Sequence, residues 1–247
     1  MSGVLKPMPE DWERALAIVA HPDDLEYGAA AAVAEWTDAG RDIAYLLVTR
    51  GEAGIDTLPP EESARVREAE QIASAAVVGV DSVTFLGHHD GVIEEGPALR
   101  RDLTAAIRSH RPELLITINH RDTWGPDSRD WNTPDHRVVG RAVLDAAGDA
   151  GNRWIFPEQL GADGAGRWDG VRWVAVAASP LPTHARAVGE RSVRRAVASL
   201  AEHRAYISAL SDLEPLAYAQ ELTTASVEAA ASAFGGRPCV AFELFPR

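Results

Sequence analysis

The sequence lacks several features that would place it in other classes of protein. Only one of its 247 residues is a cysteine, Cys239, so no disulfide can form within the chain and a reducing compartment is indicated. Basic residues are also few: 24 Lys and Arg against 37 Asp and Glu leave a formal net charge of −13. Because the chain has no basic excess to displace counterions from phosphates, we do not expect nucleic acid as a partner. The same charge argues against adsorption to anionic membranes.

Long hydrophobic runs are absent as well. No apolar stretch is long enough to cross a bilayer, and residues 1–13 contain no apolar core of the kind that a secretory signal needs. We therefore expect a cytoplasmic location and no membrane insertion. Hydrophobic residues make up 46% of the sequence and charged residues 25%, which is ordinary for a globular protein.

What the sequence does contain is an alternation of short apolar runs and helix-forming segments. Buried strands are expected at 15–20, 42–49, 80–86 and 114–118, and helices at 28–38, 61–78, 98–109 and 134–147. This alternation predicts an α/β fold of the Rossmann-like kind, a doubly wound, largely parallel sheet flanked by helices. We expect one domain over 1–247, with its core at about 14–148 and a C-terminal extension of mixed strands and helices at about 149–247.

The most informative stretch, residues 20–26 (AHPDDLE), joins the first expected strand to the first expected helix. In open α/β sheets, ligands bind at the carboxyl ends of the strands. His21 and Asp24 are three residues apart, close enough across one turn to supply a nitrogen and an oxygen to one metal ion. Asp23 lies between them, must point elsewhere, and is free to act as a base. A capping turn with solvated carboxylates is the alternative interpretation.

A second polar stretch, residues 132–137 (NTPDHR), begins the helix after the fourth expected strand. Both stretches resemble sequence motifs of the PIG-L/LmbE-like family of zinc-dependent N-deacetylases. The first departs from the His-Pro-Asp-Asp-Glu signature because Leu25 stands between Asp24 and Glu26. The resemblance runs from about residue 21 to residue 147, in the order of the family.

The resemblance implies a set of metal ligands. His21, Asp24 and His136 would hold Zn²⁺ or another divalent metal, and two His with one carboxylate leave a coordination position open, as catalytic zinc sites do. Asp135 would orient a ligand or Asp23. A helix-start histidine with a satisfied ring is the alternative interpretation of His136.

Three weaker matches concern the substrate. Residues 49–54 resemble the Thr-Asp-Gly-Glu segment of the family, with Arg50 in place of Asp. Arg67 lies in a helix that resembles the Arg-x-x-Glu element, so it is a candidate for binding substrate hydroxyls, and an ion pair with Glu70 is the alternative. Asp90 stands at the usual acidic position after the third strand, next to His89, a further candidate for the substrate site.

The activity implied by the resemblance is hydrolysis of an acetamide-type C–N bond, usually deacetylation of an N-acetylated amino sugar. The metal would polarise the acyl oxygen, and Asp23 would take a proton from water and pass it to the leaving amine. Family members often carry a histidine three residues before the last ligand, where this sequence has Thr133. The developing oxyanion would then be stabilised by the metal, by Thr133, or by a histidine from another loop. We expect His120 first, and His89 or His184 as alternatives.

Other interpretations stay open. A catalytically silent zinc-binding protein of the same fold would keep the ligands and lose the oxyanion donor, and an amidase for a non-sugar natural product would keep the chemistry on another amine. A nucleotide-binding or methyltransfer module is disfavoured because no Gly-x-Gly-x-x-Gly follows the first strand. The expected partner is a small N-acyl substrate, and the sequence leaves a homo-oligomer open.

Overall fold

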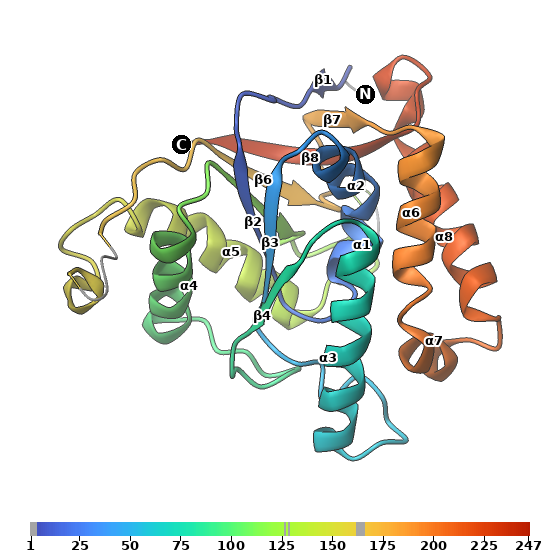
Figure 1. Ribbon diagram of the computed structural model, residues 1–247, viewed down its shortest axis with the longest axis horizontal. Coiled ribbons are helices and arrows are strands. Elements are labelled where there is room, and N and C mark those ends of the chain that lie inside the picture. Colours follow the sequence, from blue (N-terminus) through green and yellow to red (C-terminus); the bar gives the residue numbers. More distant parts are fainter. Residues whose placement is uncertain (1–3, 126, 128, 162–165) are drawn as a thin grey trace.

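The structure, a computed structural model, describes residues 4–125, 127, 129–161 and 166–247. Over these residues one sheet has eight strands in the order β1-β7-β8-β6-β5-β2-β3-β4 (Figure 1). The strands are β1 (Lys6–Pro7), β2 (Arg14–Val19), β3 (Asp42–Leu47), β4 (Ser82–Phe85), β5 (Leu114–Ile118), β6 (Trp173–Ala177), β7 (His184–Ala187) and β8 (Cys239–Pro246). Pairing is parallel from β6 through β5, β2 and β3 to β4, and β8 is antiparallel to both β6 and β7. The predicted α/β fold with a largely parallel sheet is confirmed.

Helices cover both faces of the sheet (Figure 1). On one face α4 (Pro97–His110) and α5 (Pro134–Asp149) pack together. The other face carries α1 (Asp24–Gly28), α2 (Ala30–Asp38) and α3 (Pro60–Val77). The C-terminal helices α6 (Glu190–Leu200), α7 (Arg204–Leu210) and α8 (Pro215–Ala229) pack against this second layer. Two short 3₁₀ turns are found at Pro157–Gln159 and Ala231–Phe234.

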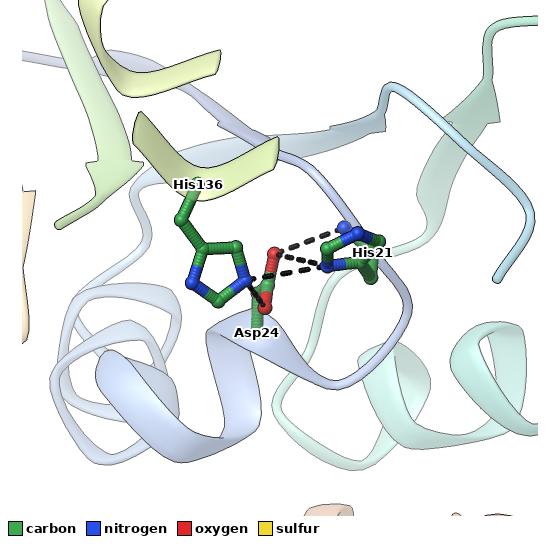
Figure 2. Close-up of side chains that lie close together, drawn as sticks. All are labelled: His21, Asp24 and His136. Atoms are coloured by element: carbon green, nitrogen blue, oxygen red, sulfur yellow. Dashed lines mark hydrogen bonds and ion pairs between the residues drawn. The ribbon is translucent and has the colours of Figure 1, made fainter. Parts of the chain in front are cut away.

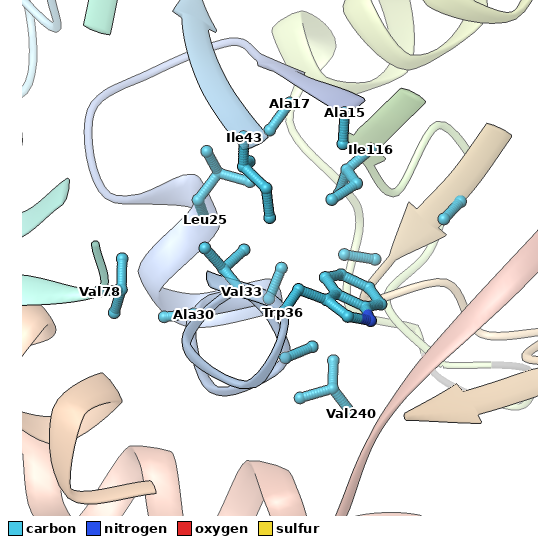
Figure 3. Packing of buried hydrophobic residues seen from close by; sticks show 14 of the residues in the cluster. Ala15, Ala17, Leu25, Ala30, Val33, Trp36, Ile43, Val78, Ile116 and Val240 are labelled. Atoms are coloured by element: carbon cyan, nitrogen blue, oxygen red, sulfur yellow. The ribbon is translucent and has the colours of Figure 1, made fainter. Parts of the chain in front are cut away.

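The central strands are apolar throughout because both of their faces are covered. Successive side chains of a strand point to opposite faces. Along β2, Ala15 and Ala17 therefore belong to the core around Trp36 of α2 (Figure 3), whereas Leu16 and Ile18 belong to the core under α4 and α5. A parallel sheet buried in this way reads as a continuous apolar run in the sequence.

The first expected helix differs most from the structure. The segment predicted as one helix at 28–38 is two helices, α1 and α2, separated at Ala29, where φ is −143°. A Cβ at Gly28 would lie 3.2 Å from Cβ of Ala177, so this turn of the chain packs directly against the end of β6.

The strands of the C-terminal region continue the same sheet. β6, β7 and β8 extend the sheet that β2 to β5 begin. No helix of the described part of the chain is long and apolar enough to span a bilayer.

Candidate active site and metal centre

A cavity of about 750 Å³ opens at the carboxyl edge of the sheet, next to the end of β2. Most of the candidate residues selected from the sequence line it: His21, Asp23, Asp24, Arg67, Asp90, Thr133, Asp135 and His136. They arrive from the loop after β2, from α1, α3 and α5, and from the loop after β4, so the parallel topology gathers them as expected.

Three side-chain atoms converge at the centre of this cavity (Figure 2). His136 Nε2 lies 3.2 Å from His21 Nδ1 and 2.9 Å from Asp24 Oδ1. The other oxygen of Asp24 lies 3.7 Å from His21 Nδ1. Ligands of a tetrahedral zinc ion with bonds of about 2.0–2.1 Å would be about 3.3 Å apart. The spacing of these donor atoms therefore fits a single small ion.

The ring of His21 is oriented by two carboxylates behind it. Its outer nitrogen, Nε2, lies 3.1 Å from Asp135 Oδ2 and 3.1 Å from Asp90 Oδ1. Because a carboxylate only accepts hydrogen bonds, the proton of a neutral His21 resides on Nε2 and the lone pair of Nδ1 faces Asp24. A carboxylate behind a ligand histidine is the usual support of a metal site.

The ring of His136 is oriented by Asn132. The Asn132 amide nitrogen donates to the backbone oxygens of Asn119 and Arg121, so its Oδ1 faces the ring and lies 3.2 Å from His136 Nδ1. His136 therefore carries its proton on Nδ1 and turns the lone pair of Nε2 toward Asp24. Two imidazole lone pairs and a carboxylate oxygen meeting at one point are a donor set for a divalent metal.

Neighbouring charges in the cluster favour the ionised forms of His21 and Asp24. Burial alone would lower the pKa of His21, but the carboxylates of Asp135, Asp24 and Asp90 outweigh it and raise that pKa well above the usual value. Burial opposes ionisation of Asp24 as well, yet His136 and His21 hold the pKa of Asp24 well below its usual range. Asp24 is thus a carboxylate that is available as a ligand.

Asp135 and Asp90 lie behind His21 and are themselves held by backbone hydrogen bonds. The carboxylate of Asp135 accepts the backbone N–H groups of Gly91 (2.7 Å) and Ile93 (3.1 Å), and Asp90 accepts that of Ala53 (2.9 Å). Their oxygens and His21 Nε2 lie within 4.8 Å of one another and form a second set of metal-compatible atoms. Because both carboxylates already accept backbone N–H groups, this geometry favours orientation of His21 over a second ion.

The backbone conformation of Asp23 directs its side chain away from this cluster. It precedes α1 with φ of 93°, in the left-handed region, and its backbone N–H donates to Gln71 Oε1 at 2.8 Å. Its carboxylate accepts a hydrogen bond from Arg67 at 3.0 Å. Burial raises the pKa of Asp23 to about 6, against the opposing charge of Arg67. Such a carboxylate can both accept and return a proton near neutral pH.

Arg67 is buried within the site instead of paired with Glu70. Its guanidinium donates to Asp23 and to the backbone oxygens of Gly51 and Pro22. A Cβ at Gly51 or Gly54 would overlap the guanidinium, so this approach requires glycine at both positions. Glu70 instead accepts the backbone N–H of Ala205 at 2.6 Å. The alternative of a solvated ion pair is wrong.

The three histidines expected near the open face do not line the cavity. His120 turns toward α5, where Gly140 leaves room for it, and its ring lies 6.0 Å from that of Phe245. His89 has a side chain that is 86% exposed and lies 3.6 Å from Glu52. His184 is on β7, on the far side of β8 and β6, where its ring meets the hydroxyl of Thr183. None of the three is therefore placed to stabilise an oxyanion in this cavity, in contrast to the expectation of His120 first and of His89 or His184 as alternatives.

Thr133 does line the cavity, and it also begins α5. Its hydroxyl oxygen accepts the backbone N–H of His136 at 3.3 Å as the helix cap, which leaves the hydroxyl proton free to donate. Among the residues considered as oxyanion donors, only Thr133 has a side chain that faces the cavity.

Tyrosine and tryptophan side chains complete the cavity, and the sequence did not single them out for it. Tyr206 of α7 lies under Arg67, with the guanidinium carbon 4.0 Å from its ring centre, and burial together with the nearby Asp23 carboxylate raises the pKa of its hydroxyl. Tyr27 and Trp124 also line it, and the Trp124 ring stands edge-on to His136 at 5.4 Å. The available signal was composition: only four tyrosines occur in the chain, and two of them line this cavity.

Comparison with known proteins agrees with this geometry. Residues 16–147, more than half of the chain, match the family model PIG-L, described as GlcNAc-PI de-N-acetylase. A diacetylchitobiose deacetylase of Thermococcus kodakarensis is 31% identical over 57% of this chain and 51% of its own length. A 1D-myo-inositol 2-acetamido-2-deoxy-alpha-D-glucopyranoside deacetylase of Kineococcus radiotolerans is 31% identical over 76% of this chain and 56% of its own length. The chain thus spans about half the length of these relatives.

Solved structures share the fold over nearly the whole chain. The N,N'-diacetylchitobiose deacetylase of Pyrococcus horikoshii superposes with a TM-score of 0.80 at 22% identity, over 96% of this chain and 85% of its own. GalB of Pseudomonas putida, a 4-carboxy-2-hydroxymuconate hydratase, superposes with a TM-score of 0.67 at 18% identity, over 95% of this chain and 97% of its own. The fold therefore carries more than one chemistry, and the family assignment rests on the sequence match. By that match, the chain belongs to the PIG-L family.

Proposed function

We propose that this protein hydrolyses the amide of a small N-acylated amine, an N-acetylated amino sugar or a related conjugate, with a divalent metal, Zn²⁺ first, held by His21, Asp24 and His136. One observation carries the proposal. Two imidazole nitrogens and one carboxylate oxygen converge in a cavity beside a second, buried carboxylate that is not part of the donor set. When bound, the metal supplies a Lewis acid that polarises the acyl oxygen and lowers the pKa of water.

The proton transfers fall to Asp23. Its position beside the donor set lets it accept a proton from the attacking water and deliver that proton to the leaving nitrogen. The hydrogen bond from Arg67 and the backbone contact to Gln71 hold Asp23 in one orientation, so the transfer needs little reorganisation.

Other residues of the cavity would bind the substrate and stabilise the oxyanion. Asp90 lines it on the side of Arg67, where its carboxylate can accept hydroxyl groups of a sugar. The Thr133 hydroxyl is placed to donate to the oxyanion that forms at the acyl carbon. A cytoplasmic location remains part of the proposal and rests on the single cysteine.

Metal analysis combined with an amine-release assay tests the proposal. Purified protein should contain about one divalent ion per chain and release amine from N-acetyl amino sugars. His21→Ala and His136→Ala should each lose most of the metal and the activity. His88→Ala is the matched control, because His88 pairs with Asp102 and does not line the cavity.

Two outcomes would contradict the proposal. Full metal retention in both His21→Ala and His136→Ala would exclude the ligand set. Stoichiometric metal without any amine release, across N-acetyl sugars and thiol conjugates, would favour the silent zinc-binding alternative or the other chemistry that this fold supports.

A further inference from the structure

The order of the strands in the sheet determines which residues line each side of the cavity. β2 lies in the middle and leads to His21 and Asp24, the proposed ligands. On the side of β3 and β4 the cavity is lined by Arg67 and Asp90. On the side of β5 and β6, beyond His136 and Thr133, the cavity is lined by the apolar side chains of Ile118, Ala178 and Trp124. The cleft thus has a charged half and an apolar half, with the donor set between them.

A second cavity continues from the apolar half. It has a volume of about 290 Å³ and shares Tyr27, Trp124 and Ala178 with the first, so the two adjoin. Its remaining wall comes from α8, β8 and the loop after β6, chiefly Pro180, Pro182, Ala229, Ala230, Val240 and Ala241. Among the described residues, no charged side chain lines it.

The carboxylate bonded to Ser179 in this wall is already paired with an arginine. Glu243 of β8 accepts hydrogen bonds from the guanidinium of Arg121 and, at 2.6 Å, from the hydroxyl of Ser179. A ligand in the second cavity therefore meets small apolar side chains and two serines, Ser179 and Ser226, with no free charge. Such a lining favours an uncharged, largely apolar group.

We propose that the second cavity receives the acyl chain of the substrate, and that the enzyme hydrolyses N-acyl groups longer than acetyl. This inference rests on the proposed amide hydrolysis. The scissile bond must lie at the donor set, and the hydroxyl-bearing amine is matched by Arg67 and Asp90 on the β3–β4 side. The acyl substituent leaves the amide carbon on the opposite side of that bond, so it points along the apolar wall into the second cavity.

The chemistry is the same for every chain length. Water adds its oxygen to the acyl carbon, the C–N bond breaks, and the proton goes to the amine, which gives a free carboxylic acid and an amine. Each methylene buried from water favours binding by about fourfold. Hexanoyl has four more methylenes than acetyl, so we expect kcat/KM to rise from acetyl to hexanoyl by up to about 250-fold if all four are buried.

The experiment uses glucosamine carrying N-acetyl, N-butanoyl or N-hexanoyl groups, with the metal-loaded full chain and an amine-release assay. Inhibition by the product acids acetate, butanoate and hexanoate supplies a second measurement, and hexanoate should bind most tightly. Ala229→Phe fills the second cavity from the end of α8 and should lower the ratio of hexanoyl to acetyl kcat/KM at least about tenfold. Thr224→Phe is the control, since Thr224 is also exposed on α8 but lines neither cavity.

The outcomes separate this inference from the function on which it rests. No hydrolysis at any chain length overturns the proposed function and this inference together. Hydrolysis of the acetyl compound alone overturns only the inference, and so does a chain-length preference that Ala229→Phe leaves intact. Loss of the preference in Ala229→Phe but not in Thr224→Phe, with both variants folded by circular dichroism, supports it.

Discussion

Asp23 and Asp24 are adjacent in the sequence, but the backbone between them turns their carboxylates toward different partners. The left-handed φ of Asp23 directs its side chain to Arg67, while Asp24, the first residue of α1, faces the two imidazoles. A non-glycine residue in this region is strained, and the strain persists only where the surroundings enforce it. Here Gln71 and Arg67 do so through hydrogen bonds.

This division of roles predicts the effect of Asp23→Asn. The change is nearly isosteric and leaves all three proposed ligands, so metal content by mass spectrometry should match the wild type. Amine release should fall at least about 10²-fold, because an amide cannot accept the proton from water. Arg67 keeps its two backbone acceptors, so the fold should tolerate the change. If Asp23→Asn lost the metal and Asp24→Asn kept it, the two roles would be exchanged.

We expect Tyr206 to act as a positioning residue for Arg67 and Asp23. Its ring packs against the Arg67 guanidinium, and burial together with the nearby Asp23 carboxylate raises the pKa of its hydroxyl. Tyr206→Phe keeps the ring contact and removes a polar group beside the Asp23 carboxylate, so kcat should fall about tenfold with KM little changed. Tyr206→Leu should lower kcat further, because it also removes the ring. Tyr45→Phe is the control, since it removes a buried, unpaired hydroxyl on β3. Equal loss of activity in Tyr206→Phe and Tyr45→Phe would argue against the role.

At the scale of elements, local pattern predicted the strands β2 to β5 and the helices α2 to α5, and long-range contacts decided much of the rest. The apolar runs around β2, β3 and β5 are buried on both faces, so composition alone marks them. The positions of the two motifs at His21 and His136 could be predicted from the sequence, because each motif comes after the end of a strand. The orientation of His120 was not, because it depends on Gly140, which is twenty residues away in α5. Tyr206 was missed for the same reason, since α7 carries no motif and reaches the site only through tertiary packing.

The contact between α5 and β5 predicts the effect of Gly140→Ala. A Cβ at this position would lie 2.7 Å from both His120 Cβ and Ile118 O, so the helix must shift. Although alanine is the better helix former by about 1 kcal/mol, overpacking should lower the free energy of unfolding by about 1–3 kcal/mol in urea denaturation. Gly148→Ala is the matched control in the same helix, where a Cβ meets nothing within 4 Å. It should be neutral or stabilising by up to about 1 kcal/mol. Equal effects of the two changes would refute the close approach.

At the scale of the whole molecule, the C-terminal third closes the site that the first two thirds begin. β8 lies between β6 and β7, and α6 packs against both α2 and α3. α7 follows directly and brings Tyr206 to the cavity, and α8 supplies a wall of the second cavity. The proposed metal ligands therefore all come from the first two thirds of the chain, whereas part of the wall of both cavities comes from the last third. This separation lets the C-terminal region change the substrate without moving the ligands.

A buried pair of ionisable side chains connects this C-terminal region to the helix beside the site. Glu26 of α1 and His203, just before α7, are both fully buried, with His203 Nε2 3.5 Å from Glu26 Oε2. Ser74 and Gln71 of α3 donate to the other oxygen of Glu26. Burial alone would lower the pKa of His203, but Glu26 outweighs it and raises that pKa above the usual value. The pair therefore stabilises the fold in its charged form.

His203→Ala should accordingly leave the Glu26 charge buried without its partner and lower the free energy of unfolding by about 3 kcal/mol at about pH 6. Because the folded pKa of His203 lies above its unfolded value of about 6.5, its contribution is complete below that pH and is lost as the pH rises through the folded pKa. The difference between wild type and variant, measured by urea denaturation, should thus shrink toward about pH 9. His89→Ala, at an exposed histidine, should show a small difference that does not change over this range. A deficit for His203→Ala that stayed constant with pH would mean that the ring acts by packing alone, and that no charge at His203 joins the C-terminal helices to the site.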